Sequence, residues 1–120
     1  MAIDFFPPRE LVCGCGCGRY NAEPELVARL NAARVIAGIP LLVTSGCRCP
    51  THNAAVGGSP SSSHLLGRAA DIAAIDSGTR WLVLNALLAA GFTRLEVGGS
   101  WIHADVDHNK QERVIWLPPV

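Results

Sequence analysis

Two histidines and an aspartate constrain the fold of this chain more than any other feature. His64 and Asp71 lie within Ser62-Ser63-His64-Leu65-Leu66-Gly67-Arg68-Ala69-Ala70-Asp71, and His103 follows in Trp101-Ile102-His103. Two imidazoles and a carboxylate are a typical ligand set of a catalytic zinc, which keeps its fourth position open for water. The fold must therefore bring these two distant segments together at one point.

Length and composition favour a single domain over residues 1–120. With 120 residues, of which 49% are hydrophobic, the chain can bury one core without dividing into two. Its ten basic and ten acidic residues cancel and form no like-charge block. We therefore expect no nucleic-acid partner. We also expect a monomer.

The sequence carries no recognisable export or membrane signal. Residues 1–8 include Asp4 and two prolines, where a secretory signal would have a basic start and an apolar run. No stretch approaches the ~20 apolar residues that span a bilayer. We expect no membrane insertion and a cytoplasmic location as synthesised.

Five cysteines fall into two groups. Cys13, Cys15 and Cys17 alternate with glycines in a loop expected over residues 1–20, and Cys47 and Cys49 form a second alternate pair. Alternate residues of an extended segment point the same way, so three thiols could converge, with Cys47 or Cys49 as a fourth. Three outcomes fit this pattern: a second, structural zinc at Cys13, Cys15, Cys17 and Cys49, one disulfide, or free thiols packed as small hydrophobic side chains.

Helices are expected at two places in the core, which should cover residues 21–117. Apolar residues at helical spacing predict a helix over residues 21–37, with Pro24 in its first turn and Gly38 as its cap. A second helix should begin at Asp76 or Ser77 and end before Gly91. A turn of helix followed by a loop is expected over residues 50–63.

Short strands should supply the rest of the core. Branched and alternating segments predict strands over residues 41–44, 69–74, 92–97 and 101–106, with an edge strand over 114–117. The fold class is therefore α+β, a small antiparallel sheet covered by helices. In the strand after Gly98-Gly99, Trp101, His103 and Asp105 share one face, while Ile102, Ala104 and Val106 share the other. The apolar face should pack against the helices, so the polar face should line a cleft.

Four segments together resemble the M15 family of zinc peptidases, which cleave peptidoglycan peptides. They are Ser45-Gly46-Cys47-Arg48, His52-Asn53-Ala54-Ala55-Val56-Gly57-Gly58, Ser62-x-His64-x-x-Gly67-x-Ala69-x-Asp71 and Trp101-Ile102-His103. The resemblance covers residues 24–116 and implies the hedgehog/DD-peptidase fold. The family includes D-alanyl-D-alanine carboxypeptidases and phage endolysins.

The resemblance also implies roles for individual residues. His64, Asp71 and His103 match the three zinc ligands of the family. Arg48 matches an arginine that faces the scissile carbonyl or a substrate carboxylate, where a fixed cation would stabilise a developing oxyanion. Ser62 matches a position that lines the site, and we expect Ser62 and Trp101 to contact the substrate.

The general base departs from the family pattern. Many members carry an acidic residue or histidine three positions before the second zinc histidine, and this chain has Ser100 there. A hydroxyl cannot accept a proton from water at neutral pH. Two carboxylates are alternatives: Glu96, at the other end of the Gly98-Gly99 turn, and Asp105, which could instead orient the His103 ring. We favour Glu96 as the base.

The sequence therefore leads to two functional hypotheses. The first is a zinc metallopeptidase, a carboxypeptidase or endopeptidase, that cleaves peptidoglycan stem or cross-bridge peptides containing D-amino acids. Such an enzyme would belong to a phage or prophage and reach the cell wall through a phage pore. The second is a non-catalytic, zinc-stabilised module for cell-wall binding or phage-tail structure, which the missing base at Ser100 favours.

Overall fold

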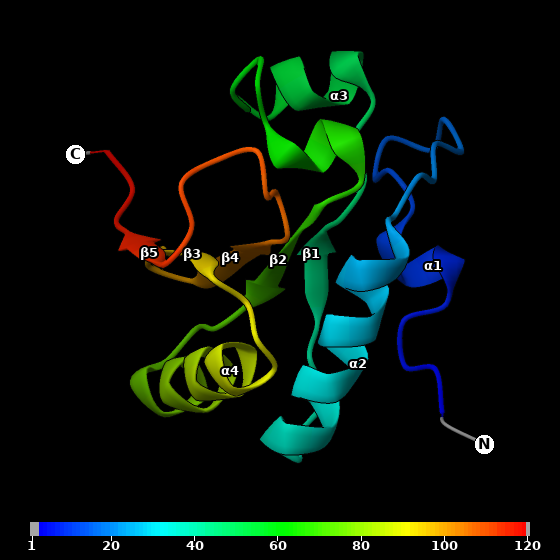
Figure 1. The fold of residues 1–120 in the computed structure, drawn as a ribbon. Helices are drawn as coiled ribbons and strands as arrows, with labels where there is room; N and C mark the ends of the chain where they lie inside the picture. Colours follow the sequence, from blue (N-terminus) through cyan, green and yellow to red (C-terminus); the bar gives the residue numbers. More distant parts are fainter. Residues whose placement is uncertain (1–2, 120) are drawn as a thin grey trace.

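A computed structural model describes residues 3–119 of the chain (Figure 1). Within these residues, helices and short strands are interspersed along the sequence, and the last three elements are all strands. In chain order the elements are α1 (Pro8–Leu11), α2 (Pro24–Ala37), β1 (Val43–Ser45), α3 (Pro50–Ala55), the 3-10 helix η1 (Ser63–Leu66), β2 (Ala69–Ala73), α4 (Ser77–Ala89), β3 (Arg94–Val97), β4 (Trp101–Asp105) and β5 (Val114–Trp116).

The strands form one sheet in the order β1-β2-β4-β3-β5. The predicted α+β class is confirmed, but the sheet is mixed because β5 runs parallel to β3. Asp105 at the end of β4 and Val114 at the start of β5 both pair with Arg94. The chain therefore leaves β4, passes β3 and enters the sheet edge in the direction of β3. A local alternation pattern predicts a strand at residues 114–117 but contains no information on its direction.

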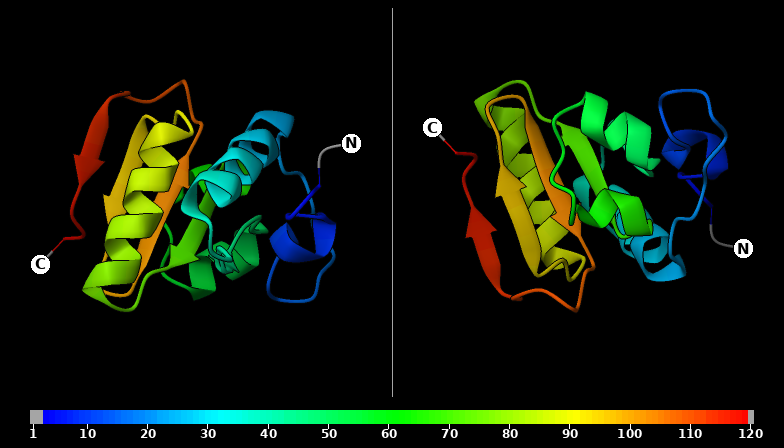
Figure 2. Two further views of the ribbon diagram at one scale, coloured as in Figure 1. Left: turned by 90° about the horizontal axis from the view of Figure 1, so that it is seen from below. Right: turned by 90° about the horizontal axis from the view of Figure 1, so that it is seen from above.

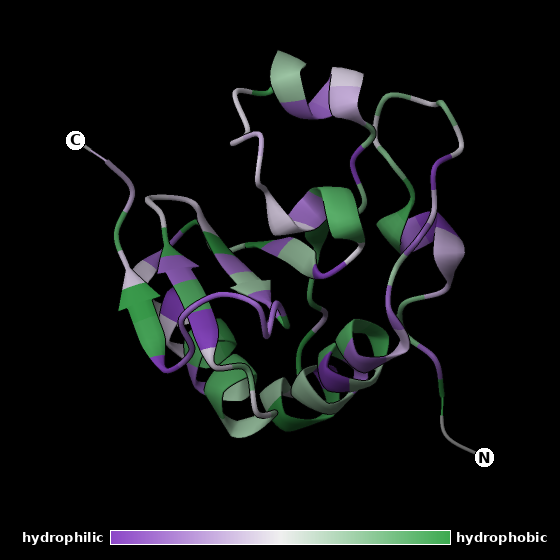
Figure 3. Cartoon of the chain, turned by 45° about the horizontal axis from the view of Figure 1, so that its top comes forward, coloured by the Kyte–Doolittle hydropathy of each residue, from purple (hydrophilic) through white to green (hydrophobic). Residues whose placement is uncertain are grey.

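Helices α2 and α4 cover one face of the sheet, whereas α3 and η1 lie over the other (Figures 1 and 2). Hydrophobic and hydrophilic residues alternate along β3 and β4 (Figure 3), so each of these two strands presents one apolar face. As predicted, Ile102 and Ala104 point into the core beneath the helices. The buried side chains that join them there include Leu26, Leu30, Ile72, Val83, Leu87 and Leu95.

Both long helices have the predicted end signals. Helix α2 begins at Pro24 and ends at Gly38, whose φ of 69° is the left-handed conformation that glycine adopts without strain. The prediction began this helix three residues early, at residue 21; the backbone of Glu23 is still extended. Asp76 caps α4, because its side chain accepts a hydrogen bond from the backbone N–H of Thr79. None of the helices in the described part of the chain has the length and apolar character that a bilayer crossing requires.

The N-terminal segment contains a short helix that the sequence analysis did not predict. Phe6, two residues before α1, and Leu11, the last residue of α1, are buried in the core. The backbone N–H of Cys47 donates a hydrogen bond of 2.8 Å to the carbonyl of Leu11. The segment expected to be a loop over residues 1–20 therefore starts with an anchored turn of helix, because two large apolar side chains gain by burial.

Gly67 ends η1 and allows this short helix to approach the start of α2. Its φ is 69°, and a Cβ atom at this position would lie 1.9 Å from the backbone oxygen of Asn21. Its carbonyl also accepts a hydrogen bond from the backbone N–H of Glu23, at 2.8 Å. Gly67 thus holds the segment that carries His64 against the helical layer.

Replacement of Gly67 should therefore destabilise the fold more than replacement of an equally left-handed glycine in open space. We expect Gly67→Ala to lower the free energy of unfolding by roughly 2–4 kcal/mol, because the new methyl group meets backbone in addition to the strain at positive φ. Gly38→Ala is the matched control: φ is again 69° with nothing within 4 Å, and about 1 kcal/mol is expected. Urea unfolding of the two variants measures the difference, and equal losses would contradict this account.

Candidate metal centre

A cleft of about 530 Å³ opens on the sheet face opposite α2 and α4. Its floor is the polar face of β4, and its walls come from η1, the loop between α3 and η1, and the C-terminal segment. The residues that line it include Arg48, Ser62, His64, Asp71, Arg94, Glu96, Trp101, His103, Asp105, Lys110 and Trp116. The polar face predicted for residues 101–105 therefore lines a cleft.

His64, Asp71 and His103 converge at the base of this cleft. They come from η1, β2 and β4, and Asp71 and His103 are direct partners across the antiparallel β2–β4 ladder. Asp71 Oδ1 lies 3.1 Å from His64 Nε2 and 3.0 Å from His103 Nδ1. One ligand atom from each residue lies within 4.8 Å of the others. This group could hold a metal ion, since zinc bonds of about 2.0–2.2 Å to nitrogen and oxygen place neighbouring ligand atoms at such separations.

Each histidine is oriented by a hydrogen bond from the ring nitrogen that faces away from Asp71. His64 Nδ1 lies 2.7 Å from the carbonyl oxygen of Gly46, which can only accept, so Nδ1 carries the proton. His103 Nε2 lies 2.8 Å from Asp105 Oδ2 and donates to this carboxylate. The remaining nitrogens, His64 Nε2 and His103 Nδ1, are the ones available to a metal. Such backing acceptors are typical of histidine ligands.

Charge at the site is balanced by closely packed partners. Burial disfavours the charged form of His103, but hydrogen bonds to Asp105 and Asp71 outweigh it and raise the pKa of His103 to about 9. Burial also disfavours ionised Asp71, yet hydrogen bonds from His103 and His64 hold its pKa well below its usual range. Both carboxylates that flank His103 are therefore ionised at neutral pH. A metal ion at this point would replace the proton on His103 Nδ1.

Asp105 is held from three directions. Its Oδ1 accepts hydrogen bonds from Arg94 Nε at 2.8 Å and from the backbone N–H of Asp107 at 3.0 Å, while Oδ2 accepts from His103. The residue is fully buried. Burial opposes its ionisation, but the hydrogen bonds from His103 and Asp107 lower its pKa. This environment suits a residue that orients His103 and leaves little room for proton exchange with a substrate.

We expect Asp105→Asn to weaken metal binding by about 10–100-fold, the range typical of lost carboxylate partners behind histidine ligands. The amide keeps the shape of the side chain but removes the charge that fixes the His103 ring. Competition with a chelator of known affinity measures the change. Asp76→Asn serves as the control, because it alters a carboxylate that caps α4 away from the cleft. Equal metal affinity in the Asp105 variant and the parent would show that Asp105 does not support the ligand.

Arg48 lies beside the three candidate ligands. Its Nη2 donates to Asp71 Oδ2 at 3.2 Å, its Nε donates to Ser45 Oγ at 2.9 Å and its Nη1 donates to Asn53 Oδ1 at 3.2 Å. Burial lowers the pKa of Arg48, and the negative charge of Asp71 partly offsets this effect. The guanidinium is thus fixed as a cation at the wall of the cleft.

The two carboxylates considered for the general base lie at different depths, because Asp105 is fully buried and Glu96 is half-buried. Glu96 is directly opposite His103 in the β3–β4 ladder and lines the cleft in a half-buried position. Residues paired in this way have Cβ atoms about 4.5–5.5 Å apart, so the Glu96 carboxylate is within reach of the metal position. Ser100 is exposed in the turn between β3 and β4.

Ser62 and Trp101 also border the cleft. Ser62 caps η1 and accepts a hydrogen bond from the backbone N–H of His64 at 3.2 Å. The ring of Trp101 packs over Gly98, where a Cβ atom would lie only 2.4 Å from it. Both side chains are half-buried and so can contact a bound molecule.

Several residues of the site were missed by the sequence analysis. Asn53 orients Arg48, Arg94 holds Asp105, and buried Asp107 accepts from Ser63 Oγ at 2.8 Å. The ring of Trp116 lies 5.7 Å from that of His103. The alternation of β4 continues to Asp107 and would have indicated it, whereas Trp116 reaches the site through the parallel pairing of β5.

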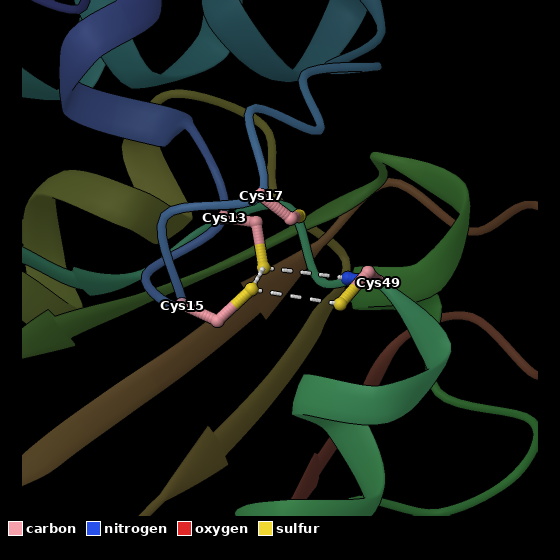
Figure 4. Close-up of side chains that lie close together, drawn as sticks. All are labelled: Cys13, Cys15, Cys17 and Cys49. Atoms are coloured by element: carbon pink, nitrogen blue, oxygen red, sulfur yellow. Dashed lines mark hydrogen bonds between the residues drawn. The ribbon is translucent and has the colours of Figure 1, made fainter.

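A second group of possible metal ligands lies apart from the cleft. Cys13, Cys15, Cys17 and Cys49 place their Sγ atoms within 4.8 Å of one another (Figure 4). Cys49 is the fourth member, whereas Cys47 is buried and accepts a hydrogen bond from the backbone N–H of Asn21 at 3.4 Å. The cysteines are free thiols in the structure.

Comparison with known proteins identifies the family. No curated protein matches this sequence significantly. A family model described as Peptidase M15 matches residues 4–107, which include every candidate ligand and catalytic residue named above. The match covers most of the chain, and the protein therefore belongs to the Peptidase M15 family.

Proposed function

We propose that this protein is a zinc-dependent peptidase that hydrolyses peptide bonds in peptidoglycan stem or cross-bridge peptides. The observation that carries the proposal is the convergence of His64, Asp71 and His103 at the base of an open cleft, with Arg48 and Glu96 at its walls. Membership of the Peptidase M15 family supports the peptidase activity. Within this proposal the protein is a lysis enzyme of a phage or prophage, as the resemblance of its motifs implies.

The donor set fits zinc better than magnesium or calcium. Each histidine has one ring nitrogen available to a metal, because the other nitrogen is already committed to Gly46 or Asp105. Imidazole with one carboxylate is a zinc ligand set, whereas magnesium and calcium take mostly oxygen ligands. His64, Asp71 and His103 would hold the ion, and when bound it would supply a Lewis acid for the scissile carbonyl and an activated water.

Glu96 is proposed to move the proton during hydrolysis. Its position opposite His103 places the carboxylate beside the point where water would attack. There it would accept the proton of the attacking water and return it to the leaving amine. Asp105 would not serve in this role, because both of its oxygens are engaged with His103, Arg94 and the backbone of Asp107.

Arg48 is proposed to stabilise the negative charge that develops on the scissile carbonyl or on a substrate carboxylate. A guanidinium has five N–H donors, and the contacts with Ser45, Asn53 and Asp71 use one on each nitrogen. The donors left on its two terminal nitrogens can meet substrate oxygen. Because the three contacts fix the guanidinium in advance, it need not reorganise as charge develops.

The cleft suits an extended peptide. Trp101 and Trp116 offer flat apolar surface on the β4 and β5 side, while Ser62 and Lys110 offer polar groups on the η1 side. Short peptides of the bacterial wall carry both apolar and carboxylate groups. We propose Ser62 and Trp101 as substrate contacts.

A non-catalytic, zinc-stabilised module for cell-wall binding or phage-tail structure remains the second candidate. The observation that favours it is Ser100, which stands in the family position of the general base and is exposed. In that case the cleft would bind wall peptides without cleaving them.

Incubation of purified peptidoglycan with the protein separates the two functions. The enzyme should release new amino or carboxyl termini, detected by mass spectrometry of the muropeptides, and a chelator should stop the release. The same spectra identify the bond and so distinguish carboxypeptidase from endopeptidase. Sedimentation with the wall without any released product would instead support the binding module.

A further inference from the structure

The Cys/Gly-rich loop gathers sulfur atoms because it curls back on itself. Gly16 and Gly18 have φ values of 86° and 85°, a conformation that favours glycine. The backbone N–H of Cys13 donates to the carbonyl of Arg19 at 2.9 Å, which closes the loop. The three thiols therefore converge through a closed turn and not through the extended alternation that the sequence pattern indicated. Cys49, the residue that caps the N-terminus of α3, meets them (Figure 4).

The spacing of the sulfurs matches a tetrahedral site. Cys13 Sγ and Cys15 Sγ are 3.5 Å apart, and Cys15 Sγ and Cys49 Sγ are 3.7 Å apart. Four sulfurs at about 2.3 Å from one tetrahedral zinc lie about 3.8 Å from each other. A disulfide needs an S–S distance of about 2.05 Å and joins one pair at a time, so it gives no reason for four thiols to meet.

Backbone N–H groups point at these sulfurs, as they do around a thiolate centre. Cys49 N–H donates to Cys13 Sγ at 3.4 Å, His52 N–H donates to Cys49 Sγ at 3.3 Å and Arg19 N–H donates to Cys17 Sγ at 3.5 Å. The loop is thus arranged to accept negative charge on sulfur.

We propose that Cys13, Cys15, Cys17 and Cys49 bind one zinc ion as thiolates, separate from the ion in the cleft, and that this centre positions the segment that carries Arg48. Binding replaces four S–H bonds by four Zn–S bonds and releases four protons to solvent. The closed four-sulfur set leaves no position for water, so the ion has a structural role.

The contacts around Cys49 connect the sulfur centre to the cleft. Cys49 follows Arg48 directly and caps α3, the helix that contains Asn53. Asn53 in turn accepts a hydrogen bond from Arg48, and the backbone N–H of Arg48 donates to the carbonyl of His64 at 3.2 Å. A metal bound to Cys49 would therefore fix the backbone next to Arg48 and the start of α3, which carries Asn53. The metal itself would not touch the substrate. Arg48 is the proposed catalytic residue and the sulfur centre is a positioning element.

Metal counting on the full-length protein tests the proposal. Purified under reducing conditions and reconstituted with zinc, the parent should bind two ions per chain. The double variant Cys15→Ser/Cys17→Ser should bind one, and His103→Ala should also bind one. Cys47→Ala is the matched control, because it removes the one cysteine outside the group, and it should bind two. His103→Ala tests the cleft ion alone. A parent that lacks the sulfur-bound ion would therefore contradict this proposal and leave the proposed function untouched, whereas a parent that lacks the cleft ion would contradict the proposed function.

Cobalt substitution shows which ion is lost. Sulfur-to-cobalt charge-transfer absorption should appear in the parent and in His103→Ala and be absent from Cys15→Ser/Cys17→Ser. If the double variant does not fold, a mercurial reagent added to the parent gives the same information, because modification of the thiols should release one zinc. Each of three results would overturn the proposal. They are iron at the four sulfurs, five reactive thiols with at most one metal per chain, and two metals in the double variant.

Stability and hydrogen exchange distinguish a metal centre from free thiols. Cys15 and Cys17 are exposed, so serine at these positions should leave the melting temperature unchanged if they are free thiols. We expect a fall of at least about 10 °C, because a bound structural metal contributes directly to folding. Amides of residues 46–53 should exchange faster in the double variant, while those of β4 should not. Unchanged exchange in residues 46–53 would show that the centre does not position Arg48.

Discussion

His103→Ala should lose the metal ion of the cleft together with all measurable peptidase activity. The imidazole lies between Asp71 and Asp105 and is nearly fully buried, so no other side chain can take its place. Without it, two ligands remain, and a catalytic zinc needs three. The thermal stability should also fall, because the ion joins η1, β2 and β4 and binds the folded state alone.

Metal analysis by mass spectrometry and thermal unfolding check this result. His108→Ala is the matched control: its side chain is 56% exposed and pairs with Glu25 and Glu112 at the surface. The control should keep the parent's metal content and activity. If His103→Ala holds the cleft ion as tightly as the parent does, the ligand assignment is wrong.

Glu96→Gln should reduce the hydrolysis rate at least about a hundredfold while the metal content stays unchanged, because general acid–base catalysis typically contributes 10²–10⁴-fold. Glutamine has nearly the same shape as glutamate but cannot accept the proton of the attacking water. The half-buried position of Glu96 opposite His103 gives it access to that water. Arg48 cannot substitute, since a guanidinium stays protonated.

Ser100→Ala is the control for Glu96→Gln, because the hydroxyl is exposed in the turn and should be dispensable. Steady-state rates on a muropeptide substrate, with metal content measured on the same samples, provide the comparison. The choice of Glu96 over Asp105 as the general base would be wrong if Glu96→Gln were as active as the parent and Asp105→Asn were inactive with its metal bound.

Local patterns in the sequence were enough to indicate the elements that surround the site. Helix α2 ends at Gly38 and helix α4 starts after Asp76, because capping depends on a few neighbouring residues. The two faces of β4 follow from the period of two in a strand, which put Ile102 in the core and His103 in the cleft. These signals depend only on neighbouring residues, so each element can be predicted from its own segment of the sequence.

The identity of the candidate metal ligands was also readable, because few residue types bind zinc and His64, Asp71 and His103 stand in a specific pattern. The contacts that surround these side chains could not be predicted from the sequence. Gly46 and Asp105 select the ring nitrogens that stay available to a metal, and Arg94 holds Asp105. Such contacts depend on which buried polar groups find partners when the strands pair, and this is settled only when the whole sheet forms.

The sequence by itself thus determined the fold class, the ends of the long helices and the residues that can bind a metal. Tertiary structure alone decided that β5 runs parallel to β3, that Trp116 reaches His103, and that Cys49 and not Cys47 joins the other three cysteines. Cys47 and Cys49 follow the same local pattern, so no short-range rule separates them. The difference arises because burial of Phe6 and Leu11 sets where the N-terminal loop meets the core, and this long-range packing places the loop beside Cys49.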